Sequence, residues 1–137
     1  MPFVLDASVA LSWCFRDEQT AYSLAVLARL EHEEAVVPSL WALEVANGLL
    51  VAERRNRVTT AELSGLLVAL GDIAVTLREA EREDVLGRVL DLARAHGLSV
   101  YDAAYLDVAM REGLPLATED QDLIGAAQRA GVARLPA

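Results

Sequence analysis

With 137 residues, 54% of them hydrophobic, the chain has the length of a single domain (residues 1–137) and enough apolar side chains for a core. Its net charge of -9, with 21 acidic residues against 12 arginines and no lysine, argues against a general nucleic-acid coat protein and excludes a P-loop, which requires lysine. The single cysteine, Cys14, and the lack of a signal-like or membrane-spanning apolar stretch lead us to expect a cytoplasmic protein.

The first half of the chain alternates short apolar runs with segments of helical periodicity. Pro38 closes an apolar run, and Ser39 after it is a good N-cap for a helix. Thr59-Thr60-Ala61-Glu62 resembles a capping box. We therefore expect strands at 3–5 and 35–37, and helices at 7–15, 19–33, 39–55 and 59–70.

The second half continues the alternation, with Gly97 and Gly113 placed where helices end and Ser99 placed as an N-cap. We expect strands at 73–77 and 114–118, helices at 80–96, 99–112 and 120–130, and a possible last strand at 132–135. Short apolar strands that alternate with helices predict an α/β fold with a mainly parallel central sheet.

Four carboxylates stand out by their positions. Asp6 and Asp120 directly follow predicted strands, Asp102 lies at the start of a helix, and Glu44 interrupts an apolar helical segment. In open α/β sheets the functional site lies beyond the carboxyl ends of the strands. Carboxylates gathered there repel each other, and a hard divalent cation such as Mg²⁺ or Mn²⁺ relieves that repulsion. A cation so held can polarise a phosphate and activate a water, which is the chemistry of phosphodiester hydrolysis.

Each of these acids alone also has a plain structural interpretation. Asp6 and Asp120 could cap the helices that follow them, and Ser99 with Asp102 could form a capping pair. Glu44 fits this interpretation poorly, because an ionised group among Leu, Trp and Val is costly unless it is paired. The four positions together favour a site.

The sequence resembles the PIN domains, and among them the VapC-type toxins of prokaryotic toxin–antitoxin pairs, over essentially its whole length. The strings that carry the resemblance are Val4-Leu5-Asp6-Ala7-Ser8, Pro38-Ser39-Leu40-Trp41 leading to Glu44, Tyr101-Asp102-Ala103-Ala104, and Leu116-Ala117-Thr118-Glu119-Asp120-Gln121-Asp122-Leu123. The resemblance implies a three-layer α/β/α sandwich, a Mg²⁺- or Mn²⁺-dependent endoribonuclease, a small cognate antitoxin and a homodimer.

The resemblance also implies roles for the acids. Asp6 and Asp102 look like the main metal ligands, Glu44 like a ligand or the group that orients water, and Asp120 like the fourth acid. Asp122, two residues further on, is the alternative to Asp120.

Several other polar residues are candidates for supporting roles. Ser8 and Thr118 match positions whose hydroxyls hold the carboxylates, and Asn47 lies one helical turn after Glu44, where it could orient it. Asp107, five residues after Asp102, points about 140° away around the helix and is interpreted as solvated surface. His32 and His96 have no metal-ligand spacing, which argues against a zinc site.

Arginines are the candidates for RNA contact. Arg54, Arg55 and Arg57 follow the helix that carries Glu44, where they could bind phosphates or complement the helix dipole. Arg16 is a weaker candidate. The apolar surfaces of the helices at 19–33 and 59–70 could form a dimer interface or an antitoxin groove, although core packing is the default.

Two other functions stay open at this point. The first is a PIN scaffold that binds RNA or protein partners without cutting, and the second is a structure-specific DNA nuclease. The complete acidic set argues against the first, and a comparison of RNA and DNA substrates decides the second.

Overall fold

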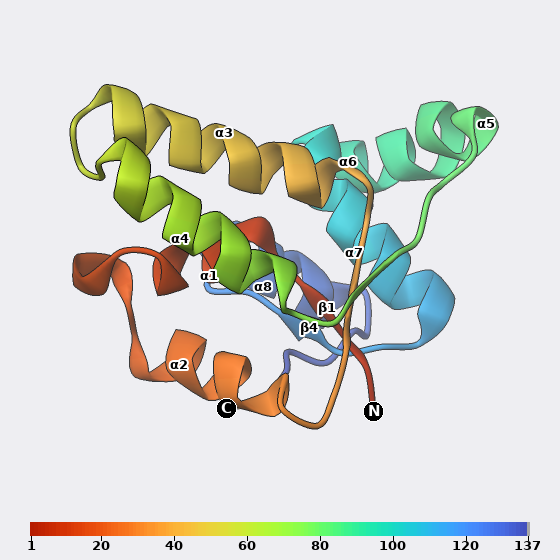
Figure 1. The fold of residues 1–137 in the computed structure, drawn as a ribbon. Helices are drawn as coiled ribbons and strands as arrows, with labels where there is room; N and C mark the ends of the chain where they lie inside the picture. The colour runs from red at the N-terminus through yellow and green to blue at the C-terminus, as the bar shows by residue number, and fades with distance from the viewer. Residues whose placement is uncertain (137) are drawn as a thin grey trace.

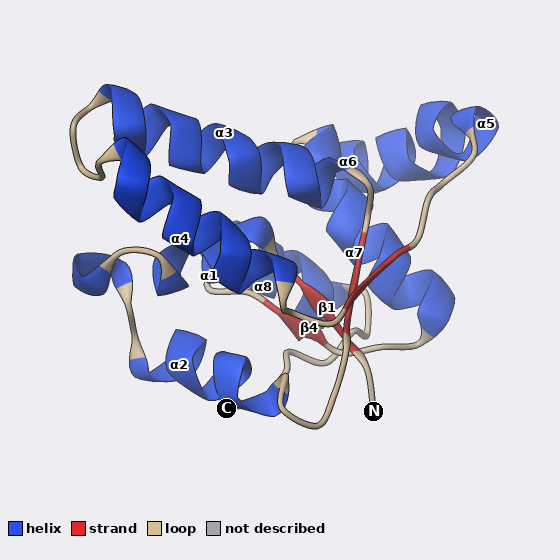
Figure 2. Ribbon diagram, in the orientation of Figure 1, coloured by secondary structure: helices blue, strands red, loops and turns tan. Residues whose placement is uncertain are grey.

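A four-stranded parallel sheet forms the centre of the molecule in the computed structural model, which describes residues 1–136 (Figures 1 and 2). The strand order is β3-β2-β1-β4, and every pairing is parallel. The strands are β1 (Phe3–Leu5), β2 (Ala35–Val37), β3 (Val75–Leu77) and β4 (Leu116–Ala117). Their carboxyl ends therefore meet at one edge, as the sequence predicts.

Helices cover both faces of the sheet. The chain moves from β1 through β2 to β3 in one direction and then crosses back to β4. Right-handed crossovers therefore place the helices before and after β3 on opposite faces, and α2 and α4 lie in front of the sheet in Figure 1 while α7 lies behind. The helices are α1 (Ala7–Trp13), α2 (Ala21–Arg29), α3 (Leu40–Arg54), α4 (Thr60–Gly71), α5 (Arg82–Asp84), α6 (Leu90–His96), α7 (Val100–Glu112) and α8 (Gln121–Arg129).

The three-layer α/β/α sandwich predicted for the chain is thus confirmed. Its core is aliphatic: the side chains of β1 and β4 are completely buried, and so are those of Tyr105 and Leu106 on the inner face of α7. In the part of the chain that the structure describes, no helix combines the length and the apolar character that a membrane crossing needs.

Gly48 allows α1 and α3 to approach closely. A Cβ atom at this position would lie 2.6 Å from Cδ1 of Leu11, so any larger residue displaces that side chain. This contact packs the middle of α3, one turn after Glu44, against the C-terminal half of α1.

Some element boundaries differ from the prediction. The helix expected at 80–96 is instead α5, a turn of π-helix η2 (Val85–Val89) and α6, because the helix is irregular around Gly87, a poor helix former. The helix expected at 19–33 begins at Ala21, since Thr20 and Ser23 form a capping box there. The possible last strand is reduced to a single bridge between Leu116 and Arg134.

The interpretation of Asp107 as solvated surface is wrong. The residue is only 1% exposed, and it is held by two arginines. Nε of Arg88 donates to Oδ1 at 2.6 Å, and Nε of Arg111 donates to Oδ2 at 2.8 Å. The periodicity of α7 turns Asp107 away from Asp102, but η2 covers that side of the helix instead of solvent.

Candidate active site

Asp6 is held by hydroxyl groups at the carboxyl end of β1. Its backbone occupies the N-cap position of α1, but its side chain makes no capping hydrogen bond, so the capping interpretation fails for this residue. Instead Ser8 Oγ and Thr118 Oγ1 each donate to Oδ2 at 2.8 Å. The side chain is buried, with 6% exposure, and this burial raises the pKa of Asp6 although the two hydroxyls oppose the shift.

Glu44 reaches the same region from the second turn of α3. Its carboxylate is half-buried and accepts a hydrogen bond on Oε1 from the hydroxyl of Tyr105, at 2.6 Å. Burial raises the pKa of Glu44, and the negative charge of Asp6 raises it further. Asp6 and Glu44, 38 positions apart in the sequence, therefore act on each other electrostatically.

Asp102 interacts electrostatically with each of the other three acids. Burial raises its pKa from 3.8 to about 6, and the charges of Asp6, Asp120 and Glu44 all contribute. Its backbone N–H donates to Ser99 Oγ at 3.0 Å, which caps α7 without using the carboxylate. The hydroxyl of Ser99 also lies near the Asp102 carboxylate and opposes the rise of its pKa.

Asp120 has two roles in the structure. Its Oδ1 accepts from the backbone N–H of Leu123 at 2.9 Å, so it does cap α8. Its charge also raises the pKa values of Asp6 and Asp102. Asp122 lies exposed in the first turn of α8. Of Asp120 and Asp122, it is Asp120 whose charge raises the pKa values of Asp6 and Asp102. The choice of Asp120 as the fourth acid stays a prediction that this geometry favours.

The residue types suit a hard divalent cation, because all four are carboxylates whose mutual repulsion such an ion relieves. Among residues 1–136, however, no three side chains of His, Cys, Asp or Glu lie in positions that could hold a metal ion as they stand. Beside Asp120 the surface opens into a hollow of about 420 Å³. The donor set therefore fits Mg²⁺ or Mn²⁺ in chemistry, and binding requires the carboxylates to turn toward one another.

Residues 3–128 match the PIN domain family. The chain belongs to this family. It is 31% identical over 123 residues to Ribonuclease VapC3 of Pyrobaculum aerophilum, an alignment that covers 90% of this chain and 92% of that protein. As a fold, this PIN domain is similar to the crystal structure of PAE2754 from Pyrobaculum aerophilum, with a TM-score of 0.65, 23% identity and coverage of 92% and 84% of the two chains. It is also similar to FitAcB from Neisseria gonorrhoeae, with a TM-score of 0.64, 19% identity and coverage of 99% and 97%.

Tyr105 is a residue of this PIN domain that the sequence reasoning missed. It is fully buried, yet its hydroxyl touches Glu44. Its spacing of three residues from Asp102 places it on the same side of α7, which is the signal that could have found it. Asn47, by contrast, lies exposed on α3, and its orienting role stays a prediction.

The predicted RNA-binding arginines differ in how they are engaged. Arg57 donates to Asp17 at 2.9 Å and to Glu18 at 3.4 Å, and its guanidinium stacks 4.4 Å from the ring of Phe15. It therefore holds the loop after α3 against the segment after α1. Arg54, Arg55 and Arg16 are exposed.

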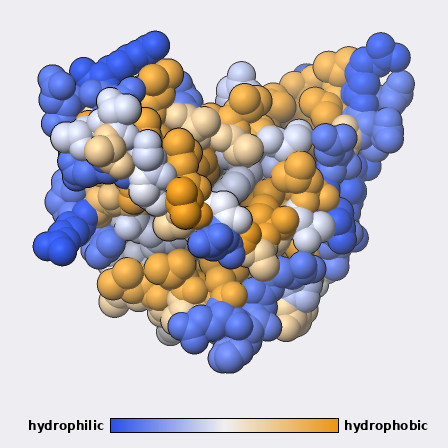
Figure 3. Space-filling view, viewed as in Figure 1, coloured by the Kyte–Doolittle hydropathy of each residue, from blue (hydrophilic) through white to orange (hydrophobic). Residues whose placement is uncertain are grey.

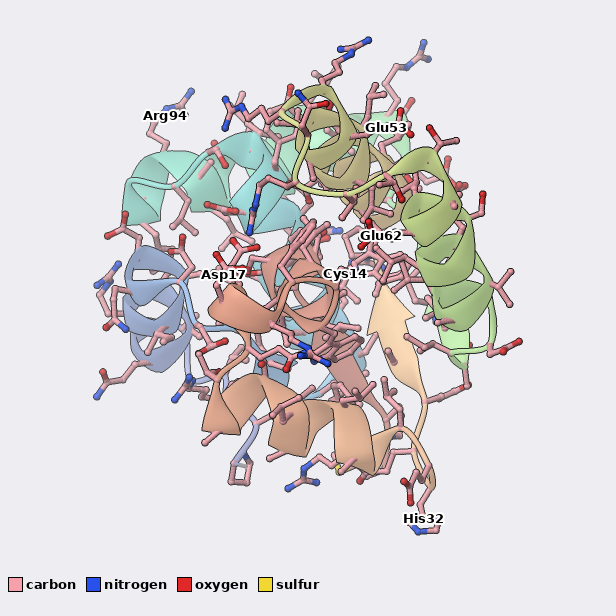
Figure 4. All side chains as sticks on the ribbon, turned by 60° about the vertical axis from the view of Figure 1, so that its left-hand side comes forward. Cys14, Asp17, His32, Glu53, Glu62 and Arg94 are labelled. Carbon is pink, nitrogen blue, oxygen red and sulfur yellow. The ribbon has the colours of Figure 1, made fainter. Side chains whose placement is uncertain are left out.

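The two histidines lie at helix ends, as expected. His32 projects from the surface at the lower edge of Figure 4, and His96 accepts from Nε of Arg129 at 3.3 Å.

Proposed function

We propose that this PIN domain is a VapC-like endoribonuclease that hydrolyses RNA phosphodiester bonds and depends on Mg²⁺ or Mn²⁺. The observation that carries the proposal is the electrostatic interaction among Asp6, Glu44, Asp102 and Asp120: burial first, and then the charges of the other three acids, raise the pKa of Asp102 to about 6. Carboxyl groups whose pKa values are raised by burial and by one another are typical of functional sites. The likeness to Ribonuclease VapC3 supports the same activity.

The divalent cation, when bound, would neutralise charge on the phosphate and activate a water for attack. We assign Asp6 and Asp102 as its main ligands. Ser8 and Thr118 engage only Oδ2 of Asp6, so these contacts orient the carboxylate and leave Oδ1 to face a ligand. Glu44, anchored through Oε1, would bind the cation or orient the water with its second oxygen.

A cleavage assay tests the proposal. Purified protein is incubated with a folded RNA and with a DNA flap substrate, in Mg²⁺, Mn²⁺ or EDTA. We expect cleavage of RNA alone, dependent on the cation, and at least a hundredfold loss of rate in Asp6→Asn. Asp72→Asn, which removes an exposed carboxylate at the end of α4, is the matched control and should cut at the wild-type rate. Full activity of Asp6→Asn, or cutting in EDTA, would contradict the proposal.

We further propose that the protein forms a homodimer and is inhibited by a small antitoxin. Apolar side chains gather over α2 and α4 on the face seen in Figure 3. Leu67 and Val68 of α4 are 52% and 68% exposed, and Leu24 and Leu27 of α2 are also exposed. An apolar surface of this kind is typical of a protein interface. Sedimentation of the protein alone and with the product of a neighbouring small reading frame tests both partners.

A further inference from the structure

Tyr105 occupies a position between three elements of the site. It lies on α7 one turn after Asp102, its ring is fully buried in the core, and its hydroxyl donates to Oε1 of Glu44 on α3 at 2.6 Å. The backbone N–H of Ala7, at the start of α1, also faces the phenol oxygen. The hydroxyl therefore lies where α1, α3 and α7 come together.

The direction of this hydrogen bond is determined by its surroundings. An ionised carboxylate has no proton to donate, so the phenol of Tyr105 is the donor and Oε1 of Glu44 is the acceptor. A hydrogen bond from a neutral hydroxyl to a carboxylate is short and strong. Only Oε1 of Glu44 is engaged in this way, which leaves Oε2 free to face a ligand.

From this geometry we infer that Tyr105 is a positioning residue, which anchors one oxygen of the Glu44 carboxylate and so limits the freedom that this side chain loses when the divalent cation binds. The inference rests on the proposed function. Glutamate has three rotatable side-chain bonds, and this side chain is only partly buried, so without an anchor all of its freedom would be lost when the cation binds. A carboxylate that is already anchored through one oxygen avoids part of that loss, which is the general effect of a supporting residue on a metal ligand.

Tyr22 offers a matched comparison for a merely structural hydroxyl. Its hydroxyl donates to the backbone carbonyl of Leu135 at 2.8 Å, and its ring stacks on Arg134. Tyr105→Phe and Tyr22→Phe each remove one hydrogen bond, to Glu44 and to Leu135 respectively. Of these two tyrosines, Tyr105 alone donates a hydrogen bond to one of the four acids, so its hydroxyl should influence the cation and that of Tyr22 should not.

Mn²⁺ titration by calorimetry tests the inference. We expect Tyr105→Phe to weaken Mn²⁺ binding about tenfold, and Tyr22→Phe to change it less than twofold. The Tyr105→Phe effect should vanish in a Glu44→Gln background, because Tyr105 acts through the charge of Glu44. Unchanged binding by Tyr105→Phe, or the same tenfold loss with and without Glu44→Gln, overturns the inference and leaves the proposed function intact. Absence of Mn²⁺ binding by the wild type overturns both.

A second measurement covers the case in which Tyr105→Phe does not fold. The chain contains three tyrosines, so wild-type protein labelled with ¹³C at tyrosine Cζ gives three NMR signals, which Tyr22→Phe and Tyr101→Phe assign by elimination. Saturation with Mg²⁺ should shift the Tyr105 signal and leave the Tyr22 signal in place. If the protein binds Mg²⁺ and the Tyr105 signal does not shift, the inference is overturned.

Discussion

The carboxyl of Asp102 shows how the site affects the stability of the folded chain. Its pKa is raised from 3.8 to about 6, first by burial and then by the neighbouring charges, so the folded state binds the proton more tightly than the unfolded state does. Between these two values the unfolded chain binds fewer protons, and the free energy of unfolding therefore falls as the pH rises. The shifts of Asp6 and Glu44 act in the same direction.

We therefore predict that the protein in EDTA melts at a higher temperature near pH 5 than near pH 7. Asp102→Asn removes the charge, so it should melt above the wild type near pH 7 and show a flatter pH profile. Thermal melts followed by circular dichroism measure both. A wild-type melting temperature that rises from about pH 5 to about pH 7 would mean that the acids do not repel each other.

Individual residues of the site differ in how visible they are in the sequence. Asp6 and Asp120 could be found because they directly follow apolar strands, and Glu44 because it interrupts an apolar helix face. Tyr105 is harder to find: it lies three residues after Asp102, but a tyrosine on the buried face of a helix also looks like an ordinary core residue. Its contact with Glu44 joins positions 61 residues apart, and only the folded chain shows it.

Among the elements, the start of each helix shows which local signals are reliable. Thr59 and Glu62 form both hydrogen bonds of the predicted capping box at α4. Ser39 occupies the predicted N-cap position of α3, but its own backbone is already helical and its side chain makes no capping bond. The sequence therefore located the starts of both helices. It did not show that the backbone of Ser39, directly after Pro38, would already be helical, so that its side chain makes no capping bond.

This difference predicts a contrast between two substitutions. Thr59→Ala should lower the free energy of unfolding by about 1 kcal/mol, because it leaves helix N–H groups without their cap. Ser39→Ala should change it by less than about 0.5 kcal/mol, since no capping bond is lost. Urea unfolding measures both, and equal losses in the two variants would refute the assignment of the caps.

The link between η2 and α7 depends on the buried carboxylate of Asp107. Asp107→Ala should cost about 1 to 3 kcal/mol of stability, since the two arginines are partly exposed and regain water. Replacement of Arg88 and Arg111 together by Ala should cost more, because it leaves a buried charge unpaired. Urea unfolding again decides, and a double variant as stable as the wild type would contradict the ion-pair account. Sequence periodicity alone could not show this contact, because it did not reveal that η2 covers this side of α7.

For the whole molecule, the net charge of -9 means that attraction to RNA must be local. Arg54 and Arg55 lie ten and eleven residues after Glu44, so about 15 Å along the helix from it, where phosphates of a bound strand can reach them. Arg57 is already paired with Asp17. The exposed pair is therefore the stronger candidate for phosphate contact.

RNA binding by the inactive Asp6→Asn protein tests this assignment. Arg54→Gln with Arg55→Gln should reduce the slope of log affinity against log salt by about 1.4, the value for two phosphate contacts on a single strand. Arg94→Gln is the control, since Arg94 projects from α6 at another part of the surface (Figure 4). An unchanged slope in the double variant would place the RNA elsewhere.

The account as a whole depends on a divalent cation among the four acids, and thermal melts with and without Mn²⁺ test this most directly. Ligand that binds only the folded state at a hundred times its dissociation constant adds about 2.7 kcal/mol of stability, or roughly 10 °C for a domain of this size. We predict such a rise for the wild type and none for Asp6→Asn or Asp102→Asn, each of which should remain folded. A wild-type melting temperature that Mn²⁺ leaves unchanged, or an equal rise in both variants, would contradict the account.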